Sequence, residues 1–252
     1  MMKKRLCRLQ LIIFIFSSCL TMINAKELTM VTVDWAPYYG SEMSNNGVIT
    51  VIVKTAFQRS GIEASIKFIP WKRAMKEVEI GKSDMLLGVY YTDKRNKTYL
   101  YSEPIYDIHV GLVALKSLGI SQFEKLLDLI PYSIGVSRGW SNSKEFDQAD
   151  YLNKQGATNQ ILNVRKLFKK RIDMISISFD VFRYEVATTS DNDLNEVVFI
   201  EPALQISTIH LATSRNNPDK ENVINAFNKG LAEIKQDGTY DKILKQYGFQ
   251  YY

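Results

Sequence analysis

Arg95 is the side chain of this sequence that could best bind an anion. It lies in the loop Tyr90–Thr98, which follows Asp84–Val89, an apolar run typical of a strand buried on both faces. A guanidinium binds a carboxylate through two parallel hydrogen bonds, and the pair is stronger where water is excluded. The alternative is a solvated loop arginine, because Lys94 and Lys97 are its neighbours. We predict that Arg95 anchors an anionic group of a small solute in a cleft, and that the protein binds this solute without transforming it.

Three aromatic side chains follow the first predicted strand, at residues 28–33. Trp35, Tyr38 and Tyr39 flank Pro37, which indicates a loop. Rings at the carboxyl end of a strand can stack on a ligand, and they can equally pack on one another as a structural loop. The sequence alone leaves both interpretations open.

The segments before Arg95 predict a sheet covered by helices. Apolar or alternating runs indicate strands, and amphipathic runs that end at Gly61 and Gly81 indicate helices. The expected elements are a strand at 28–33, a helix at 47–60, a strand at 64–69, a helix at 70–81 and a strand at 84–89. This order is typical of α/β folds with a parallel sheet, in which ligands bind beyond the carboxyl ends of the strands. The loop that holds Arg95 leaves the sheet at that end.

A second α/β unit of similar size follows. Its expected elements are a helix at 121–130, strands at 132–136 and 160–162, a basic helix at 163–171, a strand at 172–177, a helix at 179–187 and a strand at 196–200. Two apolar runs, 108–115 and 206–213, are expected to cross between two lobes as a hinge. Two final helices, from Asn217 and from Asp237, return to the first lobe. We therefore predict lobe 1 at 26–110 plus 212–252 and lobe 2 at 111–211.

The first 25 residues predict a secretory signal peptide. A basic start precedes the apolar run Leu11–Phe16 and then small and polar residues up to Ala25, after which we expect cleavage. The run is too short for a membrane anchor, which takes about 20 apolar residues. Lipidation at Cys19 is disfavoured because the aromatic Phe16 begins its motif. We expect a periplasmic protein.

The mature chain has almost no net charge. Removing the signal takes away four basic and no acidic residues, which leaves 28 Lys and Arg against 27 Asp and Glu, and no cysteine. This argues against a general nucleic-acid binder, and we interpret the basic segment 163–171 as a solvated helix face. His109 and His210 are the only histidines. No metal-binding spacing accompanies them, so we expect structural roles in the hinge and no metal or other cofactor.

Five short motifs, in order, resemble those of family 3 of the periplasmic solute-binding proteins, whose best-known members bind polar amino acids for ABC importers. The resemblance covers nearly the whole mature chain. It is carried by Gly81–Asp84, Thr92–Arg95, Tyr101–Tyr106, Ile134–Gly139 and Asp237–Gly248. It implies a two-lobed "Venus flytrap" of type II with two crossover strands, which closes on its ligand. It also implies an ABC transporter permease as partner, so that the membrane is met only through that partner.

The resemblance assigns roles to several residues. Arg95 matches the arginine that grips the α-carboxylate of the ligand, and Trp35 matches an aromatic that stacks on it. Ser141 matches a hydroxyl of the second lobe that also reaches the carboxylate. Trp140 replaces a smaller residue and could close over the ligand, or it could be a surface tryptophan.

Two departures from the family pattern bear on the ligand. Gly88 and Tyr90 fall where small hydroxyl residues often meet the ligand, and Tyr90 is large enough to narrow the cleft or to supply a phenol. The position of the acid that usually pairs with the ligand ammonium is occupied by Ser178. Asp180, two residues further on, could replace it if the loop shifts, whereas Asp173 has the structural role usual for its position. Recognition of an amino group therefore stays open.

We predict a periplasmic receptor for a small carboxylate-bearing solute, an amino acid or a related compound, that serves an ABC importer and is not an enzyme. One alternative is an enzyme on the same scaffold, similar to cyclohexadienyl dehydratases, with Asp34, Asp180 or Glu185 as its acid or base. Another is a receptor that presents its ligand to a membrane sensor kinase.

Overall fold

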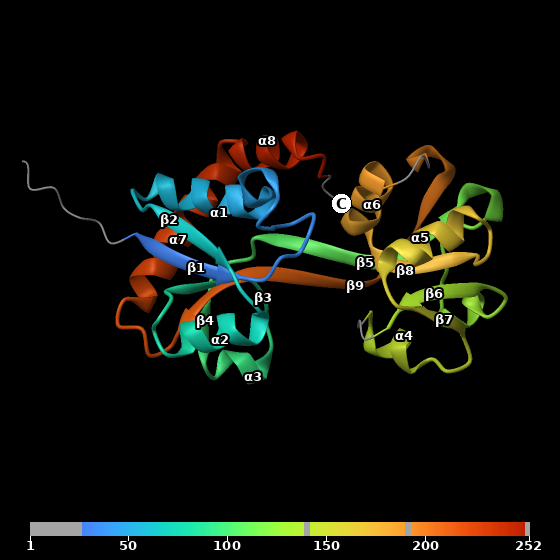
Figure 1. Cartoon of the computed structure of the whole chain (residues 1–252), viewed down its shortest axis with the longest axis horizontal. Coiled ribbons are helices and arrows are strands. Elements are labelled where there is room, and N and C mark those ends of the chain that lie inside the picture. Colours follow the sequence, from blue (N-terminus) through green and yellow to red (C-terminus); the bar gives the residue numbers. More distant parts are fainter. Residues whose placement is uncertain (1–26, 139–141, 190–192, 250–252) are drawn as a thin grey trace, which may run out of the picture.

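The computed structural model describes residues 27–138, 142–189 and 193–249. It is a two-lobed α/β fold, and two long strands run between the lobes (Figure 1). The predicted signal peptide lies outside the described residues, as do Trp140 and Ser141. Among the helices that are described, none is long and apolar enough to cross a membrane.

Lobe 1 contains the predicted parallel sheet. Its strands stand in the order β2-β1-β3, and β1 pairs in parallel with both neighbours. The strands are β1 (Leu28–Thr32), β2 (Ala64–Phe68), β3 (Met85–Tyr90) and the short β4 (Tyr99–Tyr101). The helices are α1 (Val48–Arg59), α2 (Trp71–Glu79), α3 (Asp93–Asn96), α7 (Lys220–Gln236) and α8 (Thr239–Gln246). The predicted elements of this lobe are confirmed within a few residues.

The helices of lobe 1 cover both faces of its sheet. The apolar side of α1, with Ile52, Ala56 and Phe57 fully buried, faces the sheet and α7. Gly230 lets α7 approach the backbone of α1 at Ala56, where a Cβ would overlap the carbonyl. Helix α7 begins at Lys220 with Asp219 at its cap position, so Asn217 does not cap the helix as predicted. Asn217 instead accepts a hydrogen bond from the backbone of Asp219 in the preceding turn.

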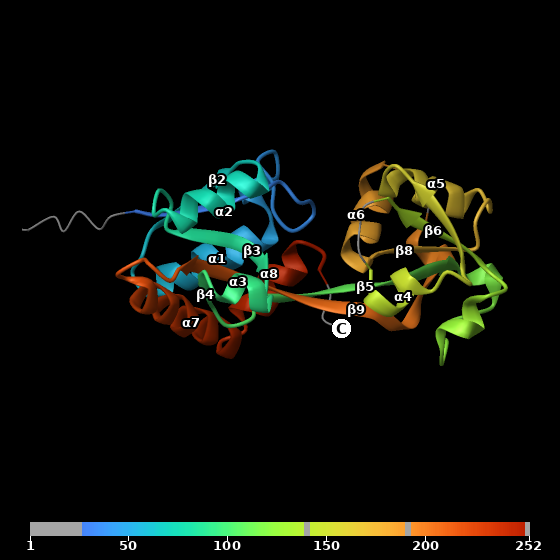
Figure 2. The ribbon, with the colours of Figure 1, turned by 90° about the horizontal axis from the view of Figure 1, so that it is seen from below.

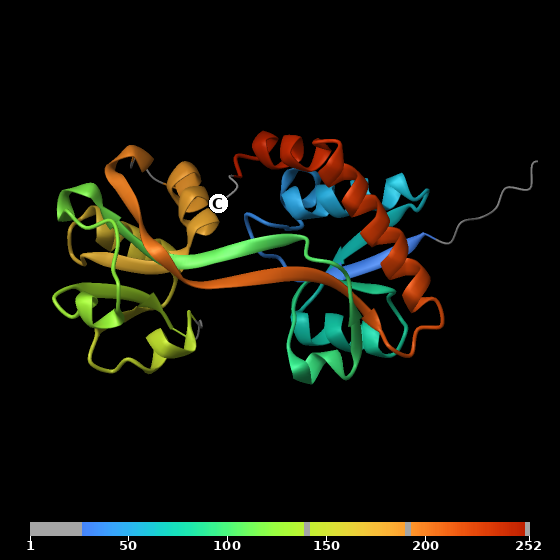
Figure 3. The ribbon, with the colours of Figure 1, turned by 180° about the vertical axis from the view of Figure 1, so that it is seen from behind.

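The strands β5 (Tyr106–Leu115) and β9 (Val197–Ser214) connect the lobes, as predicted for a hinge. They pair antiparallel from Tyr106 opposite Ile209 to Leu115 opposite Val197, with a register shift between Val110 and Leu112. Figures 2 and 3 show both strands passing continuously from one lobe to the other. The described strands thereby form one nine-stranded sheet.

Lobe 2 repeats the α/β arrangement on the other side of the hinge. Its strands stand in the order β8-β6-β7, and β6 pairs in parallel with both neighbours. The strands are β6 (Ser133–Ser137), β7 (Asn153–Ala157) and β8 (Met174–Ser178). The helices are α4 (Lys144–Gln148), α5 (Gln160–Phe168) and α6 (Phe179–Thr189).

Two expectations for lobe 2 are wrong. The segment 121–130 forms only a 3-10 turn at Leu126–Leu129, because the backbone of Phe123 pairs with the carbonyl of Glu201 instead of entering a helix. The expected strand at 160–162 is the first turn of α5, where the Asn159 side chain accepts from the backbone of Leu162 and caps the helix. The strand is β7, whose polar sequence suits a sheet edge.

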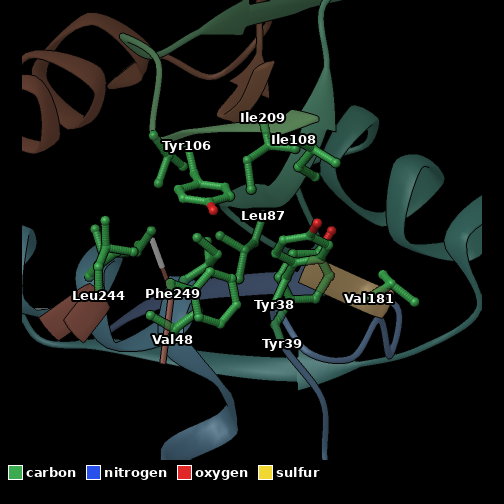
Figure 4. Close-up of a cluster of buried hydrophobic side chains, with 14 of the residues drawn as sticks. Tyr38, Tyr39, Val48, Leu87, Tyr106, Ile108, Val181, Ile209, Leu244 and Phe249 are labelled. Atoms are coloured by element: carbon green, nitrogen blue, oxygen red, sulfur yellow. The ribbon is translucent and has the colours of Figure 1, made fainter. Parts of the chain in front are cut away.

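One hydrophobic cluster extends through both lobes. It joins Met30 and Phe57 of lobe 1 to Leu167 and Phe182 of lobe 2. Figure 4 shows its central part, where Tyr38, Tyr106 and Phe249 meet close to Val181 of α6. The lobes are therefore in contact beside the hinge strands as well as joined by them.

Candidate functional site

A cavity of about 330 Å³ lies between the lobes. Its walls come from the carboxyl ends of β1 and β3, from the hinge strands and from lobe 2. The lining residues are Trp35, Tyr90, Ile108, Val110, Ser137, Asn142, Gln160, Ser176, Ile177, Ser178, Val181, Gln205 and Ser207. The place agrees with the expectation that ligands meet the carboxyl ends of the strands. We call this space the cleft cavity.

Lobe 1 contributes an aromatic wall. Trp35 sits in a tight turn, in which its backbone N–H donates to the carbonyl of Tyr39 over 2.8 Å. Its ring meets those of Tyr38 and Tyr90 edge to face, with centroids 4.9 and 5.9 Å away. The Trp35 Nε1 is buried and has no hydrogen-bond partner among the described residues. Burial raises the pKa of Tyr90 to about 12, so its phenol is neutral.

Arg95 lies beside the cleft cavity rather than among its lining residues. Its loop is ordered by Thr92, whose hydroxyl accepts from the Arg95 backbone and caps α3. The Arg95 Nη1 donates to the carbonyl of Tyr90 over 3.1 Å, and the guanidinium carbon lies 5.9 Å from the centre of the Trp71 ring. The guanidinium is thus held next to a residue that lines the cavity.

Gly88 shapes the backbone next to that wall but does not line the cavity. Its φ is 77°, a conformation that favours glycine, and it coincides with a register shift between β3 and β9. A Cβ at Gly88 would overlap the Tyr39 ring. Gly88 therefore allows Tyr39 to pack behind Trp35.

Lobe 2 contributes a wall of hydroxyl and amide groups. Ser176 donates to the Asn142 Oδ1 over 2.6 Å, and the Asn142 Nδ2 donates to Asp147 over 2.8 Å. Ser137, at the carboxyl end of β6, is 8% exposed, and its Oγ has no partner among the described residues. Sequence reasoning did not single out Ser137, Asn142 or Ser176, because serine and asparagine are common and carry no signal of their own.

Asp180 does not reach the cleft cavity. It is 4% exposed, and it accepts hydrogen bonds from Tyr106 over 2.9 Å and from Tyr38 over 3.2 Å, with Arg183 3.6 Å away. Desolvation by burial raises the pKa of this carboxyl, while the tyrosine hydroxyls and Arg183 oppose that shift. Of the two positions considered for the acid, it is Ser178 that lines the cavity.

Tyr38 bridges the lobes. Its hydroxyl lies 2.7 Å from the Ser178 Oγ as well as within reach of Asp180, and its ring packs against Phe249. Tyr38 is fully buried, so the interpretation of a packed aromatic loop is the one that the structure favours for this residue. The candidate ligand contacts Trp140 and Ser141 lie outside the described residues.

Other candidates lie away from the cleft cavity. Asp34 and Glu185, named for the dehydratase alternative, are not among its lining residues. His210 makes a hydrogen bond within lobe 1, with its Nδ1 2.8 Å from the carbonyl oxygen of Ser102. The described residues contain no group of three side chains that could hold a metal ion. A larger hollow of about 700 Å³, near Gly81 and Asp219, lies at the amino ends of β1 and β3, opposite to the strand ends that border the cleft cavity.

Comparison with known proteins gives the family. The sequence profile of the bacterial extracellular solute-binding proteins, family 3, matches residues 28–250. The chain belongs to this family. A curated relative, the probable histidine-binding protein of Campylobacter jejuni, is 26% identical over 204 residues, which cover 80% of this chain and 76% of the relative.

Solved structures share the fold. The second substrate-binding domain of a putative amino acid ABC transporter from Streptococcus pneumoniae has a TM-score of 0.70 at 23% identity, covering 88% of this chain and 99% of the domain. The second substrate-binding domain of Lactococcus lactis GlnP, in an open conformation, has a TM-score of 0.71 at 18% identity, covering 88% and 94%. The family and the Campylobacter relative are named for solute and histidine binding, in agreement with the prediction that the chain is not an enzyme.

Proposed function

We propose that this protein is a periplasmic receptor that captures a small carboxylate-bearing solute and delivers it to an ABC importer. The family and the Campylobacter relative, which is named for histidine binding, support a solute of amino-acid size. The Streptococcus pneumoniae domain, which is named as part of a putative amino acid ABC transporter, supports an importer as partner. A cavity of about 330 Å³ is at the small end of the usual range of roughly 300–1,000 Å³, which suits such a solute.

The placement of Arg95 is the observation that carries this proposal. Its guanidinium keeps one hydrogen bond to the Tyr90 carbonyl, which fixes it beside the cavity and leaves donors of the planar fork for a carboxylate. Closure of the lobes over the solute would exclude water and strengthen the pair. Trp35 and Tyr90 would pack against the rest of the solute.

A thermal-shift screen of amino acids and other small carboxylic acids tests the proposal first. A ligand at 100 times its dissociation constant adds about 2.7 kcal/mol to the free energy of unfolding, so a true ligand raises the melting temperature measurably. If no carboxylic acid raises it, the proposal is wrong.

Substitution of Arg95 tests the anchor. Removing one partner of an enclosed charge pair costs about 2–5 kcal/mol, so Arg95→Ala should weaken binding of the best ligand by roughly 30-fold or more in titration calorimetry. Arg95→Lys should lie between, because it keeps the charge and loses the planar fork. Arg73→Ala is the matched control, since Arg73 is exposed on α2 and pairs with Glu77. Unchanged affinity in Arg95→Ala would contradict the assignment.

A further inference from the structure

None of the described residues that line the cleft cavity carries a charge. The walls are aromatic, aliphatic, hydroxyl and amide side chains, and the phenol of Tyr90 is neutral. An ammonium enclosed by such walls would lose its hydration and gain no counter-charge. Burying a charge without a partner is strongly unfavourable, so the enclosed part of a ligand should be uncharged.

Asp180, two residues after Ser178, already has partners for its carboxyl group. Asp180 accepts from Tyr38 and Tyr106, and Arg183 lies 3.6 Å away. Asp180 lines a different hollow, together with Arg183 and Phe249, whereas its neighbour Val181 lines the cleft cavity. Serving a ligand ammonium would require it to leave these partners, so the fold commits it to the junction of the lobes.

The cavity walls instead hold two buried polar groups that have no hydrogen-bond partner among the described residues. The Oγ of Ser137 is buried and unpartnered among the described residues. The Nε1 of Trp35, on the facing wall, is buried and unpartnered as well, and an indole N–H can only donate. A hydroxyl or carbonyl oxygen of a ligand can accept from the indole, whereas an ammonium has no lone pair to offer. The Ser137 hydroxyl can donate to the same oxygen, so the aromatic wall sets the preference for a ligand that brings an acceptor and Ser137 can satisfy it as well.

We infer that the ligand is a small 2-hydroxy or 2-oxo carboxylic acid rather than an α-amino acid, with its hydroxyl or carbonyl oxygen directed at Ser137. This inference rests on the proposed function, from which it takes the carboxylate at Arg95. It adds that the carbon next to the carboxylate carries an uncharged oxygen. Gln160, Gln205 and Ser207 complete a neutral polar lining for the remainder of the molecule.

Matched ligand pairs test the inference. Each amino acid of a panel, such as histidine, phenylalanine or leucine, is titrated beside its 2-hydroxy and 2-oxo analogue and beside the corresponding alcohol without a carboxylate. We expect the best hydroxy or oxo acid to bind at least tenfold tighter than its amino acid. Amino acids that bind as tightly or tighter overturn the inference and leave the proposed function standing. If the alcohol binds as tightly as the acid, the proposed function is wrong in requiring a carboxylate, while the inference that the enclosed part of the ligand is uncharged is supported. Binding of no member overturns both.

Substitution of Ser137 locates the oxygen. Ser137→Ala removes a hydroxyl that has no partner among the described residues, so the melting temperature should not fall, while the hydroxy acid should bind roughly 3- to 10-fold more weakly. Ser133→Ala, at the other end of β6, is the matched control. The Ser133 hydroxyl donates to Asp173 over 2.7 Å, so its loss should lower the melting temperature and leave affinity unchanged. Unchanged affinity in Ser137→Ala overturns the contact.

Discussion

At the scale of single residues, the surroundings of Asp180 decide its role. Two tyrosine hydroxyls and Arg183 surround its carboxyl group. The sequence placed Asp180 near a ligand, but the structure encloses it where the lobes meet. Burial is the largest influence on its pKa, which is raised above the ordinary value.

A pH dependence of stability follows from this raised pKa. Between the ordinary carboxyl pKa, about 4, and the raised value, the folded protein keeps a proton that the unfolded chain has lost. The contribution of Asp180 to the free energy of unfolding therefore falls as pH rises through this window. In urea unfolding from pH 4 to 7, the stability of the wild type relative to Asp180→Asn should decline with pH. Asp241→Asn, an exposed carboxylate on α8, controls for the loss of one charge. A constant difference between wild type and Asp180→Asn would refute the prediction.

At the scale of elements, the loop after β1 contacts the start of α6. Tyr38 carries this contact, because its hydroxyl reaches Ser178 and Asp180 across the junction while its ring packs on Phe249. The ring of Tyr106, on hinge strand β5, packs against the same phenylalanine. The loop, the hinge and α6 are thus bound to one another by a small number of buried groups.

Tyr38→Phe should destabilise this junction. It removes a hydroxyl with two buried partners, one of them a carboxylate, and we expect a loss of about 1–2 kcal/mol in the free energy of unfolding. Urea unfolding followed by circular dichroism measures it. Tyr247→Phe is the matched control: the Tyr247 hydroxyl accepts from Asn45 at the surface, so its loss should cost less than about 0.5 kcal/mol. Equal stability of Tyr38→Phe and wild type would show that the bridge does not contribute.

The sequence predicted helices and strands correctly where the apolar residues follow one clear pattern, helical spacing or a continuous run. The apolar face of α1 and the apolar run of β3 are buried as expected. The segment 121–130 has apolar residues at helical spacing, but Leu127 and Ile130 are exposed in the structure, so their spacing does not mark a buried face. Strand β7 was missed because an edge strand can be polar throughout.

The candidate site could be predicted only in part. Trp35 and Tyr90 line the cleft cavity, and both come from loops or strand ends that local patterns locate. The bridge from Tyr38 to Asp180 joins residues 142 positions apart, so it depends on how the two lobes face each other. A local pattern of residues does not determine the relative orientation of the two lobes. The hydrogen bond between Ser176 and Asn142 and the burial of Ser137 likewise depend on segments that come together only in the folded lobe.

At the scale of the whole molecule, one sheet and one hydrophobic cluster run through both lobes. Strands β5 and β9 belong to each lobe, and the cluster joins Met30 and Phe57 to Leu167 and Phe182. Lobes connected only by a flexible linker would unfold independently. Here the unfolding of one lobe would expose apolar surface of the other and break the shared strands.

The two lobes should therefore unfold together. In hydrogen exchange measured by mass spectrometry across a urea series, peptides from β1 and α1 and peptides from β8 and α6 should lose protection at the same midpoint, which should also be the midpoint by circular dichroism. The reason is the cost of exposing the common cluster. Tyr38→Phe, which removes a polar bridge and leaves the cluster intact, should lower both midpoints without separating them. An earlier loss of protection in lobe 2 alone would show that the lobes are independent folding units and that the shared strands transmit little stability between them.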